Sequence, residues 1–326
     1  MNLLLTGGAG YIGSIAAAEL IGAGHRVTVY DSLVTGHRSA VPAEARFVHG
    51  ELADGPALQA ILRQEPFDAV VHFAAFIEAG ESMTQPGKYF HNNLALSLNL
   101  IEASVQAGVR RFLLSSTAAV YRTSDEPLSE ESPIGPTNVY GETKWMIEQA
   151  LEWYHRLHGL RFAALRYFNA AGASDGRGEA HRPESHLIPL VLQVPLGQRA
   201  SVQVFGDDYP TPDGTCIRDY IHVADLVAAH RLALDALDER PRQVYNLGNG
   251  SGYSVQQVIE VARRVTGHPI PSESAPRRPG DPTRLVASSS KIQQELGWQP
   301  AHPRLEDILT SAWEWHRDHP SGYPGA

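Results

Sequence analysis

A tyrosine and a lysine four residues apart, Tyr140 and Lys144, are the side chains in this sequence best suited to move a proton. On a helix, positions i and i+4 share one face, with Cβ atoms roughly 5–6 Å apart. A lysine ammonium held there, together with a positively charged cofactor ring nearby, stabilises a phenolate, so we expect the pKa of Tyr140 to lie below the value of about 10 for a free tyrosine. Such a phenolate can take a proton from a substrate hydroxyl while a hydride leaves the same carbon for a cofactor.

A glycine-rich segment near the N-terminus, GGAGYIG, is typical of dinucleotide binding. Gly7, Gly10 and Gly13 follow a strand-like run and open a helix-like one, which lets the backbone and the helix N-terminus approach a pyrophosphate. The next strand-like run ends in Asp31, where a carboxylate can accept bonds from the adenosine ribose and would repel a 2′-phosphate. The pattern favours NAD as the cofactor, and the nearby Arg38 keeps NADP as the alternative.

The elements that position these residues alternate in type through the first half of the chain. Apolar runs predict strands over 2–5, 25–30, 46–48, 69–73, 111–115 and 162–167, and helical patterns cover 12–23, 58–64, 93–107 and 140–158. This alternation predicts an α/β fold with a doubly wound parallel sheet of the Rossmann type.

The second half has a looser pattern, with frequent Gly, Pro, His and Asp. We expect a strand over 243–247 and helices over 255–265 and 292–296, with Ser254 as an N-cap. The predicted organisation is an NAD-binding domain over 1–171, to which some later segments return, and a smaller α+β substrate domain over 172–326.

Composition excludes several classes of protein. The 326 residues carry a formal net charge of −9, which argues against nucleic acid as a partner. The single cysteine, Cys216, cannot form an intramolecular disulfide. We see no signal peptide and no apolar run of the roughly 20 residues that span a bilayer, and therefore expect a cytoplasmic protein without a membrane partner.

Several longer segments resemble the UDP-glucose 4-epimerase family of the extended short-chain dehydrogenase/reductase superfamily. They are YDSLVTG, VVHFAA, SSTAAVYR, YGETK, LRYFNAAGA, FGDDYPTPDGTCIRDYIHVADL and RRPGDP, and the resemblance covers roughly residues 2–315. It implies an NAD-dependent isomerase that interconverts UDP-glucose and UDP-galactose at carbon 4 through a transient 4-keto sugar. A UDP-sugar is then the substrate, and NAD is a retained cofactor.

The resemblance also implies roles for individual residues. Tyr140 is the catalytic base, Lys144 is its partner on the nicotinamide ribose, and Thr117 bonds the sugar 4-hydroxyl. The expected cofactor contacts are Gly7, Gly10, Tyr11, Ile12, Gly13, Asp31, Glu51, Leu52, Phe73, Ala74, Ala75, Asn92, Tyr140, Lys144 and Phe168. The expected substrate contacts are Thr117, Asn169, His186, Leu187, Phe205, Arg218, Arg278, Asp281 and Leu285.

Within this set, Arg218 and Arg278 match groups on the UDP phosphates, Asp281 matches a contact to the uridine ribose, and Phe205 lies beside the uracil. The family also implies a homodimer built on the helices predicted over 93–107 and 140–158. We expect Trp145, Ile147, Leu151 and Tyr154 to contribute apolar surface to that interface.

The chain departs from the family pattern at four places. Glu51-Leu52 replaces an Asp-hydrophobic pair at the adenine, and Ile77 replaces a lysine that some members place near the cofactor pyrophosphate. His186 stands where many members have asparagine facing the substrate phosphates. Leu285 is neither the large tyrosine of strict enzymes nor a small residue, so N-acetylated sugars remain open.

Other functions remain as alternatives. A UDP-GlcNAc, UDP-pentose or UDP-uronate 4-epimerase would carry the same motifs, and a nucleotide-sensing protein that is not an enzyme could share the fold. A 4,6-dehydratase would need an acid/base pair after Thr117, where Ala118 and Ala119 stand. The fifteen histidines form no HExxH motif and there is no CxxC motif, so we expect no metal.

Overall fold

The computed structural model describes residues 1–278 and 281–324, and the chain divides into two compact units. Unit 1 comprises Met1–Arg122, Pro133–Tyr167 and Val227–Tyr245. Unit 2 comprises Thr123–Ser132, Phe168–Leu226 and Asn246–Ala326. The chain therefore leaves unit 1 for a short segment after Arg122 and again after β6, and returns to unit 1 each time.

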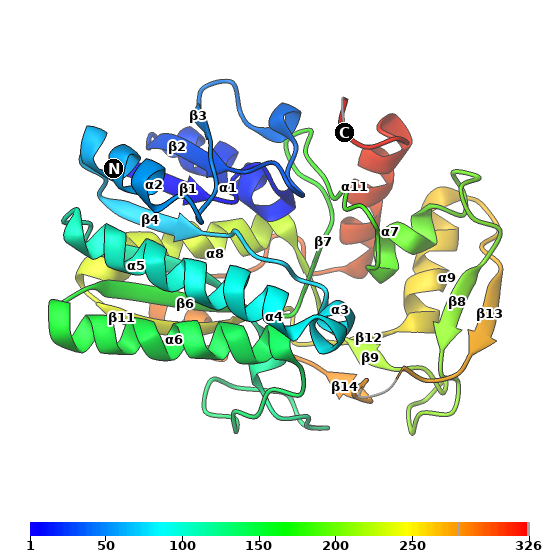
Figure 1. The fold of residues 1–326 in the computed structure, drawn as a ribbon. Helices are drawn as coiled ribbons and strands as arrows, with labels where there is room; N and C mark the ends of the chain where they lie inside the picture. Colours follow the sequence, from blue (N-terminus) through cyan, green and yellow to red (C-terminus); the bar gives the residue numbers. More distant parts are fainter. Residues whose placement is uncertain (279–280, 325–326) are drawn as a thin grey trace. The chain divides into compact units, whose positions relative to one another are not determined.

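A seven-stranded sheet forms the centre of unit 1, in the order β11-β6-β5-β4-β1-β2-β3 (Figure 1). Its strands are β1 (Asn2–Thr6), β2 (Arg26–Asp31), β3 (Arg46–His49), β4 (Ala69–His72), β5 (Arg111–Thr117), β6 (Arg161–Tyr167) and β11 (Arg242–Leu247). The strand pairings from β3 across to β6 are all parallel. The strand order reverses between β1 and β4, which is where doubly wound sheets bind their ligands.

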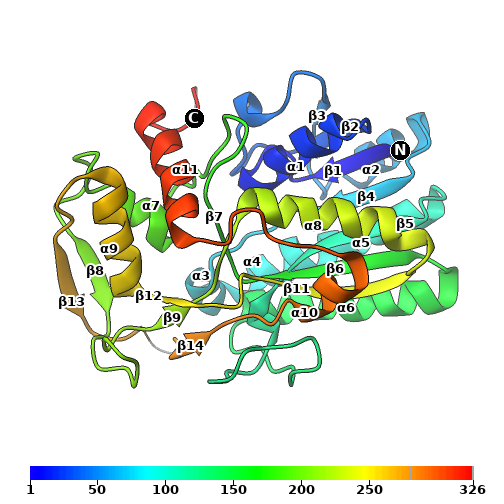
Figure 2. The same cartoon turned by 180° about the vertical axis from the view of Figure 1, so that it is seen from behind.

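Helices cover both faces of this sheet. They are α1 (Tyr11–Gly22), α2 (Gly55–Gln64), α3 (Ala79–Thr84), α4 (Pro86–Tyr89), α5 (Leu96–Gln106), α6 (Val139–His158) and α8 (Val223–Asp235), with short helices η1 (Arg38–Ala40), η2 (Phe90–Ala95), η3 (Ala118–Val120) and η4 (Ala236–Asp238). Figure 1 shows α5 and α6 in front of the sheet, and Figure 2 shows α1 and α8 on the opposite face. The prediction of a doubly wound parallel sheet is confirmed.

Local sequence explains why these elements form. Every residue of β1, which reads NLLLT, is buried, as expected for a strand covered on both faces. Helix α2 begins at Asp54, whose side chain accepts from the Ala57 backbone N–H at 3.0 Å and so caps the helix. The core beneath α2, α5 and α6 includes Leu58, Leu100 and Leu151, each 1% exposed or less.

Two helical predictions for unit 1 need correction. The helix predicted over 93–107 is two elements, the π-type turn η2 followed by α5. Helix α8 was missed, although its sequence VADLVAAHRLALD repeats apolar residues at helical spacing. The helix follows a stretch with frequent Gly, Pro, His and Asp, and this composition predicts loops.

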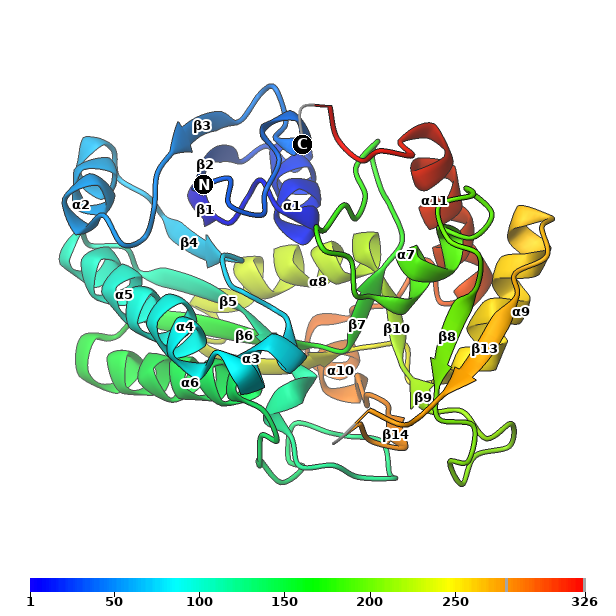
Figure 3. The ribbon, with the colours of Figure 1, turned by 45° about the vertical axis from the view of Figure 1, so that its right-hand side comes forward.

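Unit 2 is built from short strands and four helices (Figure 3). Its strands are β7 (Asn169–Ala171), β8 (Val202–Phe205), β9 (Ile217–Arg218), β10 (Tyr220–His222), β12 (Tyr253–Ser254), β13 (Ser272–Ala275) and β14 (Arg284–Leu285). Its helices are α7 (Leu187–Leu192), α9 (Val255–Thr266), α10 (Ser290–Leu296) and α11 (Leu305–Asp318). The predicted Ser254 cap is present as a full capping box with Gln257.

The core of unit 2 forms where α7, α9 and α11 meet the β8–β13 pair, and Figure 3 shows these elements gathered together. Fully buried members include Val191, Val258 and Ile308. Helices α7 and α11 and the strands β8 and β13 were not predicted. Over residues 1–278 and 281–324, no helix has the length and apolarity that a membrane crossing requires.

Candidate active site

The glycine loop after β1 is built for close approach of a ligand. Gly7 has a φ of +74°, and a Cβ added there would lie 2.4 Å from the backbone nitrogen of Ala74. A Cβ on Gly13 would lie 2.2 Å from the Gly7 carbonyl oxygen, so only glycine lets α1 start against the loop. Gly10, the N-cap of α1, has no side-chain cap, and the first turn carries no acidic residue. This helix start therefore fits the pyrophosphate of a dinucleotide.

Asp31, at the end of β2, is held beside this loop by backbone donors. Its two carboxylate oxygens accept from the Ala9 N–H at 2.9 Å and from the Leu33 N–H at 2.8 Å. The remaining lone pairs suit the hydroxyls of an adenosine ribose. The Arg38 guanidinium lies over the Phe47 ring, 4.6 Å from its centroid. The geometry therefore favours NAD over NADP.

The remaining cofactor positions of unit 1 lie on several segments. Phe73 and Ala74, which follow β4, both donate from their backbones to the Thr6 carbonyl, at 2.8 and 3.1 Å. Among the positions predicted from the sequence, Tyr11 is buried, Glu51 is exposed, and the others are half-buried, namely Ile12, Leu52, Phe73, Ala74, Ala75 and Asn92. Asn93, which was missed, is fully buried, and its side chain binds both backbone groups of Phe76 at 2.9 Å.

Tyr140 lies in the first turn of α6, close enough to Thr117 at the end of β5 for the Thr117 hydroxyl to lower the pKa of the Tyr140 phenol. The helix begins at Asn138, whose side chain accepts from the Gly141 N–H at 2.8 Å. A further anchor that the sequence did not suggest is Ser82, whose hydroxyl accepts from the Tyr140 N–H at 3.1 Å. The structure thus brings together Tyr140 and Thr117, which were predicted as partners.

The protein's own groups do not by themselves lower the pKa of Tyr140. Burial raises this pKa to about 12, and the Thr117 hydroxyl lowers it only in part. Lys144 was expected to lower it, but its ammonium instead donates to the Ser115 carbonyl at 2.7 Å. The protein's own groups therefore keep Tyr140 as a neutral phenol at pH 7.

Lys144 is itself buried, with 1% of its surface exposed. Burial lowers the pKa of Lys144 to about 8, and the Glu148 carboxylate opposes this effect. Glu148 is one turn further along α6 and binds the Arg166 guanidinium of β6 at 2.6 Å, with both side chains about 5% exposed or less. Glu148 and Arg166 were not predicted, although the Lys144–Glu148 spacing repeats the i, i+4 spacing that singled out Tyr140 and Lys144.

Replacing Lys144 with methionine should reveal the cost of burying this ammonium. The pKa of Lys144 is about 8 in the folded chain and about 10.4 in an unfolded chain, so the unfolded chain binds more protons between these values. The native chain should therefore gain stability relative to Lys144→Met as the pH rises from about 8 to about 10.4. Urea unfolding of the native protein and of Lys144→Met, both stripped of nucleotide, gives the difference in unfolding free energy at each pH. The titrations of the groups that both proteins share cancel in this difference. A difference that is flat or falls with pH would contradict the prediction.

The predicted substrate residues of unit 2 form two contacting pairs. The Arg218 guanidinium donates to the Asp281 carboxylate at 2.6 Å, and the Arg278 guanidinium lies over the Phe205 ring at 4.1 Å from its centroid. Leu285 pairs with Arg218 in the β14–β9 ladder. The structure thus gathers four groups suited to a nucleoside diphosphate, which are two cations, an aromatic ring and a carboxylate.

The other residues predicted for cofactor or substrate in unit 2 lie on separate segments. Phe168 and Asn169 lie at the start of β7, where the Asn169 side chain donates to the Asp219 carbonyl at 2.8 Å. Asp219, which was not predicted, is fully buried and accepts from three backbone N–H groups at 2.8 to 3.0 Å. His186 and Leu187 begin α7, and the His186 imidazole contacts the Glu179 and Glu184 carboxylates.

Comparison with known proteins agrees with this geometry. The model of the NAD dependent epimerase/dehydratase family matches residues 3–248. A UDP-glucose 4-epimerase from Halalkalibacterium halodurans is 51% identical, over 99% of this chain and 98% of its own length. A crystal structure of a UDP-glucose 4-epimerase has a TM-score of 0.96 at 50% identity over 99% of both chains. A crystal structure of UDP-glucose 4-epimerase from Bifidobacterium longum in complex with NAD+ and UDP has a TM-score of 0.94 at 37% identity, over 99% of this chain and 100% of that one. The chain belongs to the NAD dependent epimerase/dehydratase family and, within it, to the UDP-glucose 4-epimerases.

Proposed function

We propose that this protein is an isomerase that interconverts UDP-glucose and UDP-galactose by inverting carbon 4 of the hexose. The observation that carries the proposal is the proximity of Tyr140 and Thr117, with Lys144 one turn along the same helix as Tyr140. This arrangement lies in the unit that also contains the glycine loop and Asp31. These residues are suited to removing a proton from a substrate hydroxyl beside a bound dinucleotide.

NAD is the cofactor that these residues fit. The uncapped start of α1 receives the pyrophosphate, and the Asp31 carboxylate receives the adenosine ribose. When bound, NAD supplies a hydride acceptor at carbon 4 that later returns the hydride to the other face of the sugar. Lys144 holds the nicotinamide ribose, and a positive charge brought near Tyr140 lowers the pKa of that phenol.

Tyr140 moves the proton in this reaction, and Thr117 orients the group that gives it up. The phenolate oxygen accepts the proton of the sugar 4-hydroxyl, and loss of this proton together with the hydride of carbon 4 leaves a 4-keto sugar. The same phenol later returns that proton to the ketone oxygen after the sugar has turned. Because proton and hydride both return, there is no net oxidation of the substrate.

The UDP group is held by unit 2 in this proposal. Arg218 and Arg278 supply cations for the two phosphates, Phe205 packs beside the uracil, and Asp281 accepts from the uridine ribose. Binding energy from UDP is remote from carbon 4, so it can retain the 4-keto sugar while the hexose rotates.

One assay tests reaction type and cofactor retention together. Purified protein is incubated with UDP-galactose without added NAD, and the sugar nucleotides are separated by chromatography. We expect UDP-glucose to form. Parallel reactions with UDP-N-acetylgalactosamine and a UDP-pentose address the other sugars, which the chemistry of Leu285 leaves open. No conversion of UDP-galactose, even after NAD is added, would refute the proposal.

The protein is proposed to act as a homodimer through α6. Ile147 and Leu151, which were expected at the interface, are instead buried in the core of unit 1. The exposed apolar residues of α6 are Met146, Trp153 and Leu157, at 36%, 58% and 71% exposure. Their spacing of seven and four residues places them on one stripe of the helix. This stripe is the face that a second subunit would cover.

The double variant Trp153→Glu/Leu157→Glu should therefore be monomeric. Two carboxylates at the centre of an apolar interface would be desolvated without partners, which opposes association. Light scattering after gel filtration gives the mass, and we expect half the mass of the native protein. Val34→Glu, which changes an apolar residue 65% exposed in unit 1, is the matched control and should keep the native mass. A native protein that is already monomeric would refute the dimer.

The proposed location is the cytoplasm. Cys216 is buried as a free thiol, and burial raises its pKa, so it is a poor nucleophile for disulfide exchange. A chain that needs no disulfide is compatible with a reducing compartment.

A further inference from the structure

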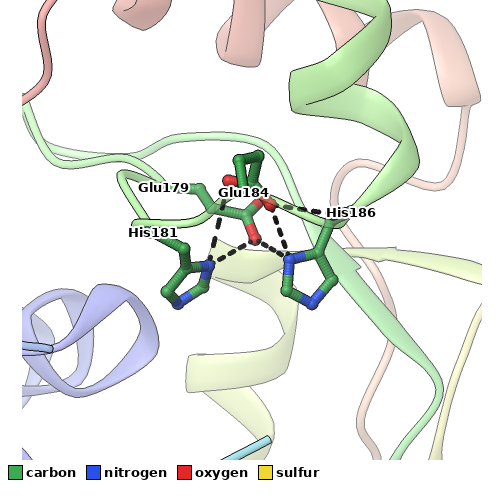
Figure 4. A group of neighbouring side chains, drawn as sticks. All are labelled: Glu179, His181, Glu184 and His186. Carbon is green, nitrogen blue, oxygen red and sulfur yellow. Dashed lines mark hydrogen bonds and ion pairs between the residues drawn. The ribbon is translucent and has the colours of Figure 1, made fainter. Parts of the chain in front are cut away.

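Four side chains of unit 2 converge on one point in the segment between β7 and α7. They are Glu179, His181, Glu184 and His186, and one ligand atom from each lies within 4.8 Å of all the others. Figure 4 shows the two imidazoles facing the two carboxylates through the same ring nitrogen, Nδ1. The sequence gives no sign of this arrangement, because the spacing E-x-H-x-x-E-x-H matches no familiar metal motif.

The distances between these atoms are those of a compact metal site. The Nδ1 atom of His181 lies 3.0 Å from Glu179 Oε1 and 3.9 Å from Glu184 Oε2. The Nδ1 atom of His186 lies 2.9 Å from an oxygen of each carboxylate. Donors about 2.0 Å from a tetrahedral zinc ion are separated by about 3.3 Å, and these four nitrogen–oxygen distances lie within about 0.6 Å of that value.

Charge also favours a cation at the centre of the cluster. Within the part of the chain that the structure describes, the ion-pair partners of both carboxylates are these two imidazoles. The two imidazole rings are 5.2 Å apart and face the same two carboxylates. One divalent ion at the centre would neutralise the charge of both carboxylates.

The backbone around the cluster is held in place by other contacts. The Tyr323 hydroxyl binds both backbone groups of Gly178, at 3.0 and 3.2 Å, directly before Glu179. The backbone N–H groups of Ser185 and His186 both donate to a Glu184 oxygen at 2.8 Å. Hydrogen bonds that orient ligating carboxylates in this way are typical of metal sites.

We propose that Glu179, His181, Glu184 and His186 form a tetrahedral zinc site that fixes the segment leading into α7. Two imidazole nitrogens and two carboxylate oxygens suit zinc, whereas calcium and magnesium prefer oxygen ligands alone. The site is structural, because all four coordination positions are filled by the protein. It does not depend on which sugar nucleotide the enzyme converts.

Metal analysis of the full-length protein tests the proposal. The native chain is treated with a chelator, equilibrated with zinc, desalted and analysed by elemental mass spectrometry, and we expect one zinc ion per chain. Glu179→Gln and His181→Gln should each lower zinc affinity by about 10–100-fold or more. His268→Gln, which replaces an exposed histidine of the same unit, is the control and should retain zinc.

A second measurement protects the test against variants that fail to fold. Cobalt(II) added to the chelated native protein should give the intense visible absorption bands of a tetrahedral site, and zinc should abolish them. Native protein that retains no zinc after desalting, or Glu179→Gln and His181→Gln variants that retain as much as the native chain, would overturn the proposal.

Discussion

Replacing Tyr140 with phenylalanine should lower kcat for epimerisation by about 10²–10⁴-fold, the usual contribution of a positioned general base. The change keeps the ring in place and removes only the phenol oxygen beside Thr117. Because the glycine loop and Asp31 are untouched, the variant should retain as much NAD as the native protein. Initial rates with UDP-galactose, together with the NAD released on denaturation, give both quantities.

Tyr154→Phe is the matched control for this experiment. Tyr154 is on the same helix, but its hydroxyl donates to Glu102 at 2.6 Å on the exposed side of α6. Its loss should leave kcat near the native value. If Tyr140→Phe kept a native rate, another group would have to accept the 4-hydroxyl proton, and the proposed mechanism would fail. A purely nucleotide-sensing protein would be indifferent to both changes.

The elements that hold the cofactor could be predicted because their signals are local. Glycine at 7, 10 and 13, a buried strand before them and an acid at the end of the next strand all lie within about thirty residues, the length of one βαβ unit. The steric reason for each glycine is equally local, since the Cβ of Gly13 would meet the Gly7 carbonyl. The doubly wound sheet followed from the same short-range alternation.

The support beneath the catalytic lysine depends on contacts that a local pattern cannot reveal. Arg166 lies on β6 and binds Glu148 on α6, and nothing in the sequence around Arg166 shows that it is buried. Lys144 alone does not give Tyr140 a low pKa, for a related reason. Spacing identified a charge one turn away, but the degree of burial, which dominates the pKa of Tyr140, depends on the whole fold.

Unit 2 was the less predictable half of the chain. Its strands have two to four residues each, too few for a period of two to be seen. The Arg218–Asp281 and Arg278–Phe205 pairs join residues more than sixty positions apart, so only the family resemblance suggested that they cooperate. Those assignments stay predictions until substrate binding is measured in variants.

Replacing Arg166 with methionine should destabilise the protein by about 3–5 kcal/mol, because it leaves the Glu148 carboxylate buried without its cation. The Arg166 side chain is 5% exposed and that of Glu148 is 4% exposed. Urea unfolding measures the loss. Arg161→Met is the matched control on the same strand, since Arg161 pairs with Asp238 near the surface, with side chains 33% and 55% exposed. The Arg161–Asp238 pair should contribute about 0–1 kcal/mol to the free energy of unfolding.

A double variant distinguishes two free energies of unfolding: the net contribution of the Arg166–Glu148 pair, and the loss caused by removing only one of its partners. If Arg166→Met is destabilising because a charge is stranded, then adding Glu148→Met should recover most of the lost stability. Recovery should not extend to function, because the carboxylate that raises the pKa of Lys144 is then gone and the buried ammonium loses its proton more easily. The double variant should therefore be folded, yet have its alkaline loss of activity at a lower pH than the native enzyme. Equal destabilisation by Arg166→Met and by Arg161→Met would show that the buried pair is no more costly to break than a surface one, and the proposed support for Lys144 would fail.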